Sequence, residues 1–141
     1  MAGTNVSFRL KNTLNELDRL YRELETFADA IGLSKKLLFQ INLALDELFT
    51  NIVSYGFPDS RLHWVTITLL HADNTVTIRV EDNGKPFDPA ATNVPETQAD
   101  LQNCRVGGLG LRLVRQMMDD MAYERNGRKN ITTLTKHLGD C

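Results

Sequence analysis

Two of the residues best suited to chemistry lie in a stretch with helical periodicity. Glu47 and Asn51 are four residues apart, so their side chains share one face of the predicted helix. A carboxylate and a carboxamide offer oxygen atoms to a hard cation such as Mg²⁺, which takes few protein ligands and keeps several waters. The same pair also suits the solvated polar face of an amphipathic helix, so the pattern alone leaves both interpretations open.

A second candidate segment runs from Glu81 to Phe87 and follows an alternating, strand-like run. Asp82 could accept a hydrogen bond from an exocyclic amine, and Gly84 would let a flat ring approach the backbone closely. The alternative is an ordinary turn, because Asp-Asn-Gly sequences form turns readily.

The third segment is glycine-rich and reads Gly107-Gly108-Leu109-Gly110-Leu111 at the start of a helical pattern. Glycines at a helix N-terminus expose backbone N–H groups toward a phosphate. No lysine followed by Ser or Thr is present, and Leu113 replaces the third glycine of a dinucleotide fingerprint, so neither of those motifs applies. The glycines could also serve only a tight turn. In this order, however, the three segments supply sites for a metal, a base and a polyphosphate.

Strands and helices that position these segments follow from hydrophobic periodicity. Alternation predicts strands over 6–10, 65–69 and 76–80, with Asp73 and Asn74 in a hairpin turn. Helical spacing predicts helices over 14–31 and 37–52, then a third helix and a closing pair of strands. The expected capping residues are Asn12 or Thr13 and Ser34 at the two helix starts, and Gly32 at the first helix end.

The predicted fold class is α+β. It is a two-layer sandwich of a mostly antiparallel mixed sheet with helices on one face, because the elements do not alternate as βαβα. The chain of 141 residues has a net charge of −2 and 42% hydrophobic residues, as expected for one globular domain over 1–141.

Composition also limits the location and the partners. No apolar run reaches the roughly 20 residues needed to cross a bilayer, and the first ten residues lack a signal-peptide pattern. The absence of a basic block argues against direct nucleic-acid binding. Cys104 and Cys141 form neither a disulfide framework nor a metal spacing. We therefore expect a cytoplasmic protein with reduced thiols and no membrane contact.

The ordered set Glu47…Asn51, Asp82-x-Gly84-x-x-Phe87 and Gly108-x-Gly110 resembles the Bergerat ATP-binding fold. DNA gyrase, a heat-shock chaperone, histidine kinases and a mismatch-repair ATPase share that fold. Within it, the chain is most similar to the anti-sigma-factor serine kinases. The phrases that carry this resemblance are Ala44-Leu45-Asp46-Glu47, Thr50-Asn51-Ile52, Tyr55-Gly56, Asp82 to Pro89, Gly107 to Leu111 and Leu134-Thr135-Lys136.

The resemblance implies roles for individual residues. Asn51 would bind Mg²⁺, and Glu47 would act as general base on the attacking hydroxyl or orient it through water. Asp82 would bind adenine with Gly84 beside it. The segment 90–106 would form a lid over the nucleotide. The remaining implied nucleotide contacts are Phe87, Arg105, Gly108, Leu109, Gly110 and Leu111, with Arg105 reaching the terminal phosphate.

Two positions depart from the family pattern. Related kinases often have Gly-Thr just before the last strand, where the threonine supports adenine; this chain has Lys129-Asn130 there, with Thr132 and Thr133 slightly later. Tyr55 stands where a histidine often precedes the glycine.

In function, the resemblance implies an ATP- and Mg²⁺-dependent serine/threonine protein kinase and anti-sigma regulatory factor. Its substrate would be a small anti-anti-sigma-type protein, and a sigma factor or another regulatory protein would bind in a competing state. The first helix and its neighbouring strand could supply a homodimer face.

Three alternatives differ in class. A nucleotide-sensing binding module without kinase activity would use the same pocket, although it would not need a base at Glu47. A histidine-kinase catalytic domain is disfavoured because no phosphoacceptor helix precedes the first predicted strand. A purely structural domain would make the three motifs coincidental.

Overall fold

A five-stranded sheet forms one layer of the molecule in the computed structural model, which describes residues 3–86 and 106–139. The strand order is β1-β2-β3-β5-β4, and all four pairings between these strands are antiparallel. The strands are β1 (Thr4–Lys11), β2 (Trp64–Ala72), β3 (Thr75–Asp82), β4 (Asp120–Asn126) and β5 (Lys129–His137). Because β5 lies between β3 and β4, the end of β3 is brought beside the start of β5.

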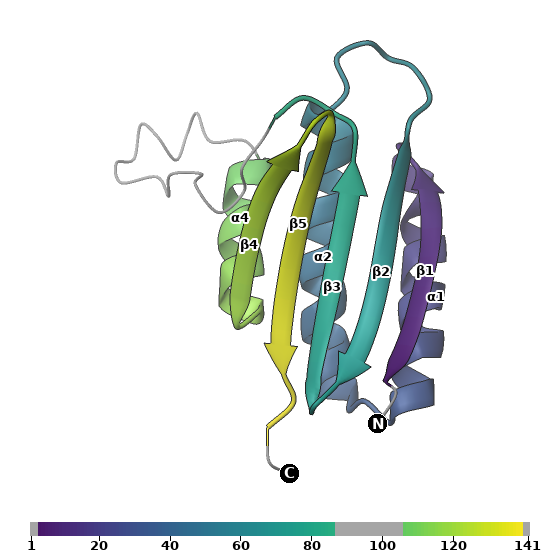
Figure 1. Ribbon diagram of the computed structural model, residues 1–141, viewed down its shortest axis with the longest axis vertical. Helices are drawn as coiled ribbons and strands as arrows, with labels where there is room; N and C mark the ends of the chain where they lie inside the picture. Colours follow the sequence, from purple (N-terminus) through teal and green to yellow (C-terminus); the bar gives the residue numbers. More distant parts are fainter. Residues whose placement is uncertain (1–2, 87–105, 140–141) are drawn as a thin grey trace.

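The helices form a second layer on one face of this sheet, with α2 between α1 and α4 (Figure 1). They are the short 3₁₀ helix η1 (Leu14–Glu16), α1 (Leu17–Ile31), α2 (Lys35–Tyr55) and α4 (Val106–Met117). The predicted two-layer α+β architecture is therefore confirmed. Where the sequence predicted a mixed sheet, the described strands pair only in antiparallel fashion.

The hydrophobic core lies between the two layers. Alternate residues of β2 and β3, such as Val65, Ile67, Ile78 and Val80, are buried on the helix-facing side. A continuous stripe along α2 packs against them, which is the arrangement expected when strands of period two meet a helix of period 3.6. The members of that stripe are Ile41, Ala44, Leu45, Leu48 and Ile52.

Most of the predicted turn and cap residues are confirmed. The Ser34 hydroxyl oxygen accepts a hydrogen bond from the Leu37 N–H at 3.2 Å, and Gly32 ends α1 with a φ of 69°. Asp73 and Asn74 both have positive φ in the β2–β3 hairpin, as a type I′ turn requires.

Of the two predicted cap residues, Thr13 occupies the N-cap position of η1, but without a side-chain capping bond. Neither side chain makes a capping bond at the first helix start. The Asn12 amide instead donates to the Arg61 carbonyl at 3.0 Å and accepts from the His63 N–H at 2.9 Å. Asn12 therefore holds the loop that follows α2, a long-range role that local spacing does not reveal.

The C-terminal end of α4 is anchored to β5. The Lys136 ammonium donates to the Met117 carbonyl at 2.6 Å, where a helix leaves its last carbonyls unpaired. The Asp119 N–H donates to the Thr135 carbonyl at 2.8 Å, and the Asp119 carboxylate accepts from the His137 N–H at 2.6 Å. These bonds fix the helix that carries the glycine motif.

No helix within 3–86 or 106–139 combines the length and the apolar character that crossing a bilayer requires.

We expect Lys136→Met to lower the free energy of unfolding by about 1–2 kcal/mol, because a charged donor to a helix C-terminus is lost. Urea denaturation followed by circular dichroism measures this difference. Lys129→Met, an exposed position on the same strand, is the matched control. Equal stability of the two variants would show that the Lys136 bond contributes nothing to the anchor.

Candidate functional site

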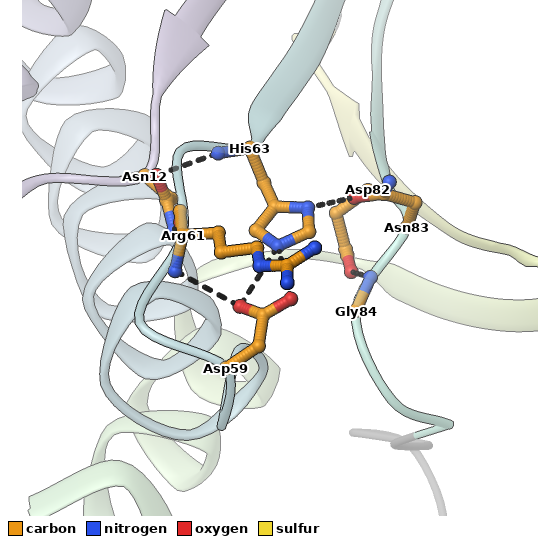
Figure 2. Close-up of polar contacts among 7 residues, drawn as sticks. All are labelled: Asn12, Asp59, Arg61, His63, Asp82, Asn83 and Gly84. Atoms are coloured by element: carbon orange, nitrogen blue, oxygen red, sulfur yellow. Dashed lines mark hydrogen bonds and ion pairs between the residues drawn. The ribbon is translucent and has the colours of Figure 1, made fainter.

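Asp82, the predicted adenine ligand, is the last residue of β3 and continues the inward-facing series of Ile78 and Val80. Its side chain is 6% exposed and points into the space between sheet and helices. The Asp82 Oδ1 accepts a hydrogen bond from the Gly84 N–H at 2.8 Å, which closes the turn after the strand (Figure 2). The segment is therefore a turn, as one interpretation proposed, but a turn built around a buried carboxylate.

Asn130 lies directly opposite Asp82 in the ladder between β3 and β5, and it is 4% exposed. Its amide nitrogen donates to Asp82 Oδ1 at 2.9 Å, to the Lys85 carbonyl at 2.9 Å and to the Gly84 carbonyl at 3.3 Å. The residue that departs from the family's Gly-Thr pattern therefore supports the whole turn from Asp82 to Lys85.

Tyr123 and Arg125 of β4 complete this support, and the sequence alone did not indicate them. The Tyr123 hydroxyl donates to Asn130 Oδ1 at 2.5 Å, and Arg125 Nη1 donates to the same oxygen at 3.0 Å. Arg125 Nη1 also donates to the Gly84 carbonyl at 2.8 Å. Their spacing of two residues could have indicated that both side chains lie on one face of a strand. In the structure that strand pairs with β5, where Tyr123 lies opposite Thr132 and Arg125 opposite Asn130.

Asn51, the predicted Mg²⁺ ligand, occupies a position on α2 where the apolar stripe faces the sheet. It is 3% exposed, so the interpretation as a solvated polar face is wrong for this residue. Its amide nitrogen is buried and, among the described residues, has no hydrogen-bond partner. A buried amide that the protein leaves unpaired is typical of a group that meets a ligand, water or ion.

Helix α2 and the sheet bring the two predicted residues together at one cavity. Asn51, Asp82, Asn130 and Thr132 all contribute to its lining. It encloses about 10 Å³, roughly the space of one water molecule. This space is smaller than a purine base, so lining side chains such as the exposed Lys85 would have to move before a ligand of that size could enter.

The turn after β3 also contacts the end of α2 at close range. The Lys85 N–H donates to the Gly56 carbonyl at 2.9 Å. A Cβ atom added at Gly84 would lie 2.6 Å from the Gly56 oxygen and 2.9 Å from Asp82 Oδ1. Gly84 was predicted to admit a flat ring; in the structure, the approach of the Gly56 backbone already requires a glycine there.

Glu47, the predicted base, lies one helical turn before Asn51 and is half-buried. It does not line the cavity described above. Its role as a base stays a prediction.

The glycine motif falls within the first turns of α4, which begins at Val106 and packs against α2. Gly108, Leu109, Gly110 and Leu111 are thus part of a helix start, as predicted. Phe87, Arg105 and most of the predicted lid at 90–106 lie outside the described residues.

His63, in the loop after α2, contacts the turn that follows Asp82 at Asn83. Its Nε2 lies 2.8 Å from an Asp59 carboxylate oxygen and its Nδ1 lies 3.1 Å from Asn83 Oδ1, both within hydrogen-bond distance (Figure 2). The ring stacks on Phe57 with 4.5 Å between centroids. The loop after α2 therefore holds Asn83, the residue next to the buried carboxylate.

Two carboxyl groups near the site have shifted pKa values. Burial raises the pKa of Asp82, while the hydrogen bonds from Asn130 and Gly84 and the Arg125 charge act in the opposite direction. Burial, and then the neighbouring charge of Glu47, raise the pKa of Asp46 to about 6. The Asp46 Oδ1 is buried and, among the described residues, no donor reaches it.

We expect Asp46→Asn to raise the free energy of unfolding at pH 8, by up to about 1 kcal/mol after allowance for solvent screening. The folded state favours protonated Asp46 in the wild type. The stability that the protonated group contributes is fully present below the ordinary pKa of 3.8 and is lost as pH rises through about 6. Denaturation at pH 5 and pH 8 measures the difference, with Asp29→Asn on the exposed face of α1 as control. If the free energy of unfolding of Asp46→Asn changed with pH as it does in the wild type, the raised pKa of Asp46 would be contradicted.

A protein-family model described as a histidine kinase-like ATPase domain matches residues 10–136, and the chain belongs to this family. The chain is 35% identical over 104 residues to the serine/threonine-protein kinase BtrW of Bordetella bronchiseptica, covering 74% of this chain and 73% of BtrW. It is 30% identical over 121 residues to the serine-protein kinase RsbW of Listeria monocytogenes, covering 83% of this chain and 76% of RsbW.

A crystal structure of the RsbU and RsbW domains of a Mycobacterium tuberculosis protein is similar in fold. The TM-score is 0.69 at 17% identity, and the match covers 95% of this chain and 32% of that one. Together with the family match, these similarities confirm the predicted resemblance to the anti-sigma-factor serine kinases.

Proposed function

We propose that residues 1–141 act as one ATP-binding domain that phosphorylates a serine or threonine of a small anti-anti-sigma-type protein. The observation that carries the proposal is that Asn51 and Asp82, from separate elements, are both buried at one cavity. The relation to two protein serine/threonine kinases, each matched over more than two thirds of its length, supports the same reaction. The proposal places the protein in the cytoplasm, where ATP and sigma factors occur.

Asp82 would recognise the nucleotide base. The Gly84 and Asn130 N–H groups both bind Oδ1, and no donor among the described residues reaches Oδ2. Oδ2 is therefore available as an acceptor for an exocyclic amine. Adenine carries such an amine, whereas a 6-oxopurine has a carbonyl at that position.

Asn51 would hold Mg²⁺ through its carboxamide oxygen. Its side chain lies beside Asp82 in the lining of the cavity, and its buried amide nitrogen, which is a donor and does not ligate cations, has no hydrogen-bond partner among the described residues. The described residues contain no group of three or more His, Cys, Asp or Glu side chains that could hold a metal. That composition suits an ion held by one protein oxygen, phosphates and waters. Bound Mg²⁺ supplies charge neutralisation at the phosphates.

Phosphoryl transfer depends on positioning and electrostatics more than on covalent chemistry by the protein. The acceptor hydroxyl oxygen would attack the γ-phosphorus, the bond to ADP would break, and Glu47 would take the hydroxyl proton. This needs Glu47 within about 2.6–3.2 Å of the hydroxyl, directly or through one water. The backbone N–H groups at the start of α4 would face the phosphates.

The same nucleotide site would control the choice of partner. A sigma factor or another regulatory protein would bind in one nucleotide state and the phosphorylation substrate in another. A ligand shifts such an equilibrium only as far as its affinities for the two states differ. ATP and ADP differ by the γ-phosphate, so the difference would arise near Asn51 and the α4 N-terminus.

We expect the wild-type protein to bind ATP in a Mg²⁺-dependent manner, as measured by calorimetric titration. Asp82→Asn should weaken ATP binding by about 10-fold or more, because an amide N–H would face the adenine amine. Asn51→Ala should remove the dependence on Mg²⁺. Both variants should stay folded by circular dichroism. Unchanged affinity of Asp82→Asn would remove the adenine assignment, and unchanged Mg²⁺ dependence of Asn51→Ala would remove the metal assignment.

Glu47→Gln should keep ATP affinity and lose phosphoryl transfer by about 100-fold or more, in the range typical of a general base. Transfer of radiolabelled phosphate to a purified anti-anti-sigma-type protein measures it. Glu23→Gln, at a half-buried position on α1, controls for loss of one carboxylate. Full transfer activity in Glu47→Gln would show that Glu47 is not the base.

A further inference from the structure

Each hydrogen bond in the polar network around Asp82 has a defined donor and acceptor. Arg125 can only donate hydrogen bonds, and it points at Asn130 Oδ1 together with the Tyr123 hydroxyl. The Asn130 amide nitrogen therefore faces the other way, toward Asp82 Oδ1 and the carbonyls of Gly84 and Lys85. The amide orientation is thus fixed by its partners on both sides, with donors on one side and acceptors on the other.

The orientation of the Asn130 amide determines whether Asp82 Oδ2 is a hydrogen-bond acceptor or a donor toward a ligand. Because Oδ1 already receives two N–H groups, at 2.8 Å and 2.9 Å, these bonds stabilise the ionised carboxylate. Oδ2 is then an acceptor. If the Asn130 donor were absent, the buried carboxyl would hold a proton more easily, and that proton would lie on Oδ2. A protonated Oδ2 is a donor and pairs with a carbonyl instead of an amine.

We propose that Asn130 is a specificity-determining residue of the nucleotide site, which keeps Asp82 an acceptor and so selects 6-aminopurines over 6-oxopurines. Arg125 and Tyr123 are positioning residues, which act on the base only through the Asn130 amide. The inference rests on the proposed function, because it assumes that a purine nucleotide binds beside Asp82. It assigns a role to the position where related kinases often have threonine.

The contribution of Arg125 has two parts. Its Nη1 donates to Asn130 Oδ1 at 3.0 Å and to the Gly84 carbonyl at 2.8 Å, so it holds both the amide and the turn. Its positive charge also favours ionised Asp82. Since Arg125 is on edge strand β4 and its guanidinium does not line the cavity, it can be replaced without removing a group that would touch the base.

The test compares ADP with IDP, which replaces the 6-amine of the purine by an oxo group and N1 by N1–H. Calorimetric titration at pH 7.5 with Mg²⁺ gives both dissociation constants for the wild type and for Asn130→Leu, Asn130→Thr and Arg125→Met. Arg128→Met, an exposed arginine in the β4–β5 turn, is the matched control. Thermal melting of each variant without nucleotide reports whether it is folded.

We expect the wild type to bind ADP at least about 10-fold more tightly than IDP, which is the size of one good hydrogen bond. Asn130→Leu should lower that ratio about 10-fold, and Arg125→Met should lower it by a smaller factor. Asn130→Thr should recover most of the ratio, because its hydroxyl can donate to Asp82. Arg128→Met should leave it unchanged.

A purely structural role would weaken ADP and IDP equally, so an unchanged ratio in Asn130→Leu would overturn the inference while leaving ATP binding by the protein intact. If Asn130→Leu is unfolded, the ratio in Arg125→Met decides the question in the same way. Failure of the wild type to bind ADP would overturn the proposed function, and this inference with it.

Discussion

A carboxylate buried between a sheet and its helices is stable only if hydrogen-bond donors reach it, because removing an unpaired charge from water costs several kcal/mol. Asp82 satisfies this condition with donors from two places: the Gly84 N–H of its own turn and the Asn130 amide of β5. Asn130 is in turn held by two residues of β4. The geometry of the site therefore depends on the register of three strands, since a one-residue slip would turn these side chains to the other face.

The second constraint joins α2 to this strand end. The backbone at Gly84 approaches the Gly56 carbonyl so closely that no side chain fits, and the Lys85 N–H bonds to the same oxygen. Asn12 and His63 hold the loop after α2 at its other end, and His63 lies beside Asn83. The backbone contact of Gly84 and Lys85 with Gly56 therefore ties the end of α2, which carries Asn51, to the turn that follows Asp82.

Periodicity was sufficient to predict the elements, because alternation in β2 and β3 and the apolar stripe of α2 arise directly from burial on one face. The residue types of Asn51 and Asp82 also indicated the site, although only the structure shows that Asn51 belongs to the buried stripe. Asn130 could not be assigned from spacing, because its partner is the residue opposite it in a ladder whose register local sequence does not determine. The role of Asn12 could not be predicted for the same reason, because its hydrogen-bond partners lie about fifty residues away in the sequence. In the proposed reaction the acceptor hydroxyl belongs to a second protein, so the place of Glu47 relative to it does not follow from this sequence.

Helix α2 carries unpaired buried polar groups, one of them at the site. Within the described part of the chain, the buried side-chain atoms without a hydrogen-bond partner are Asn42 Oδ1, Asp46 Oδ1 and Asn51 Nδ2, and all three are on this helix. Each such group lowers stability by about 1–3 kcal/mol relative to a satisfied one. The cost is tolerable because the same helix buries a long apolar stripe against the sheet. Asn51 is also part of the cavity lining, where a ligand could satisfy its amide. An apolar residue there would stabilise the helix and remove the only amide that α2 contributes to this lining among the described residues.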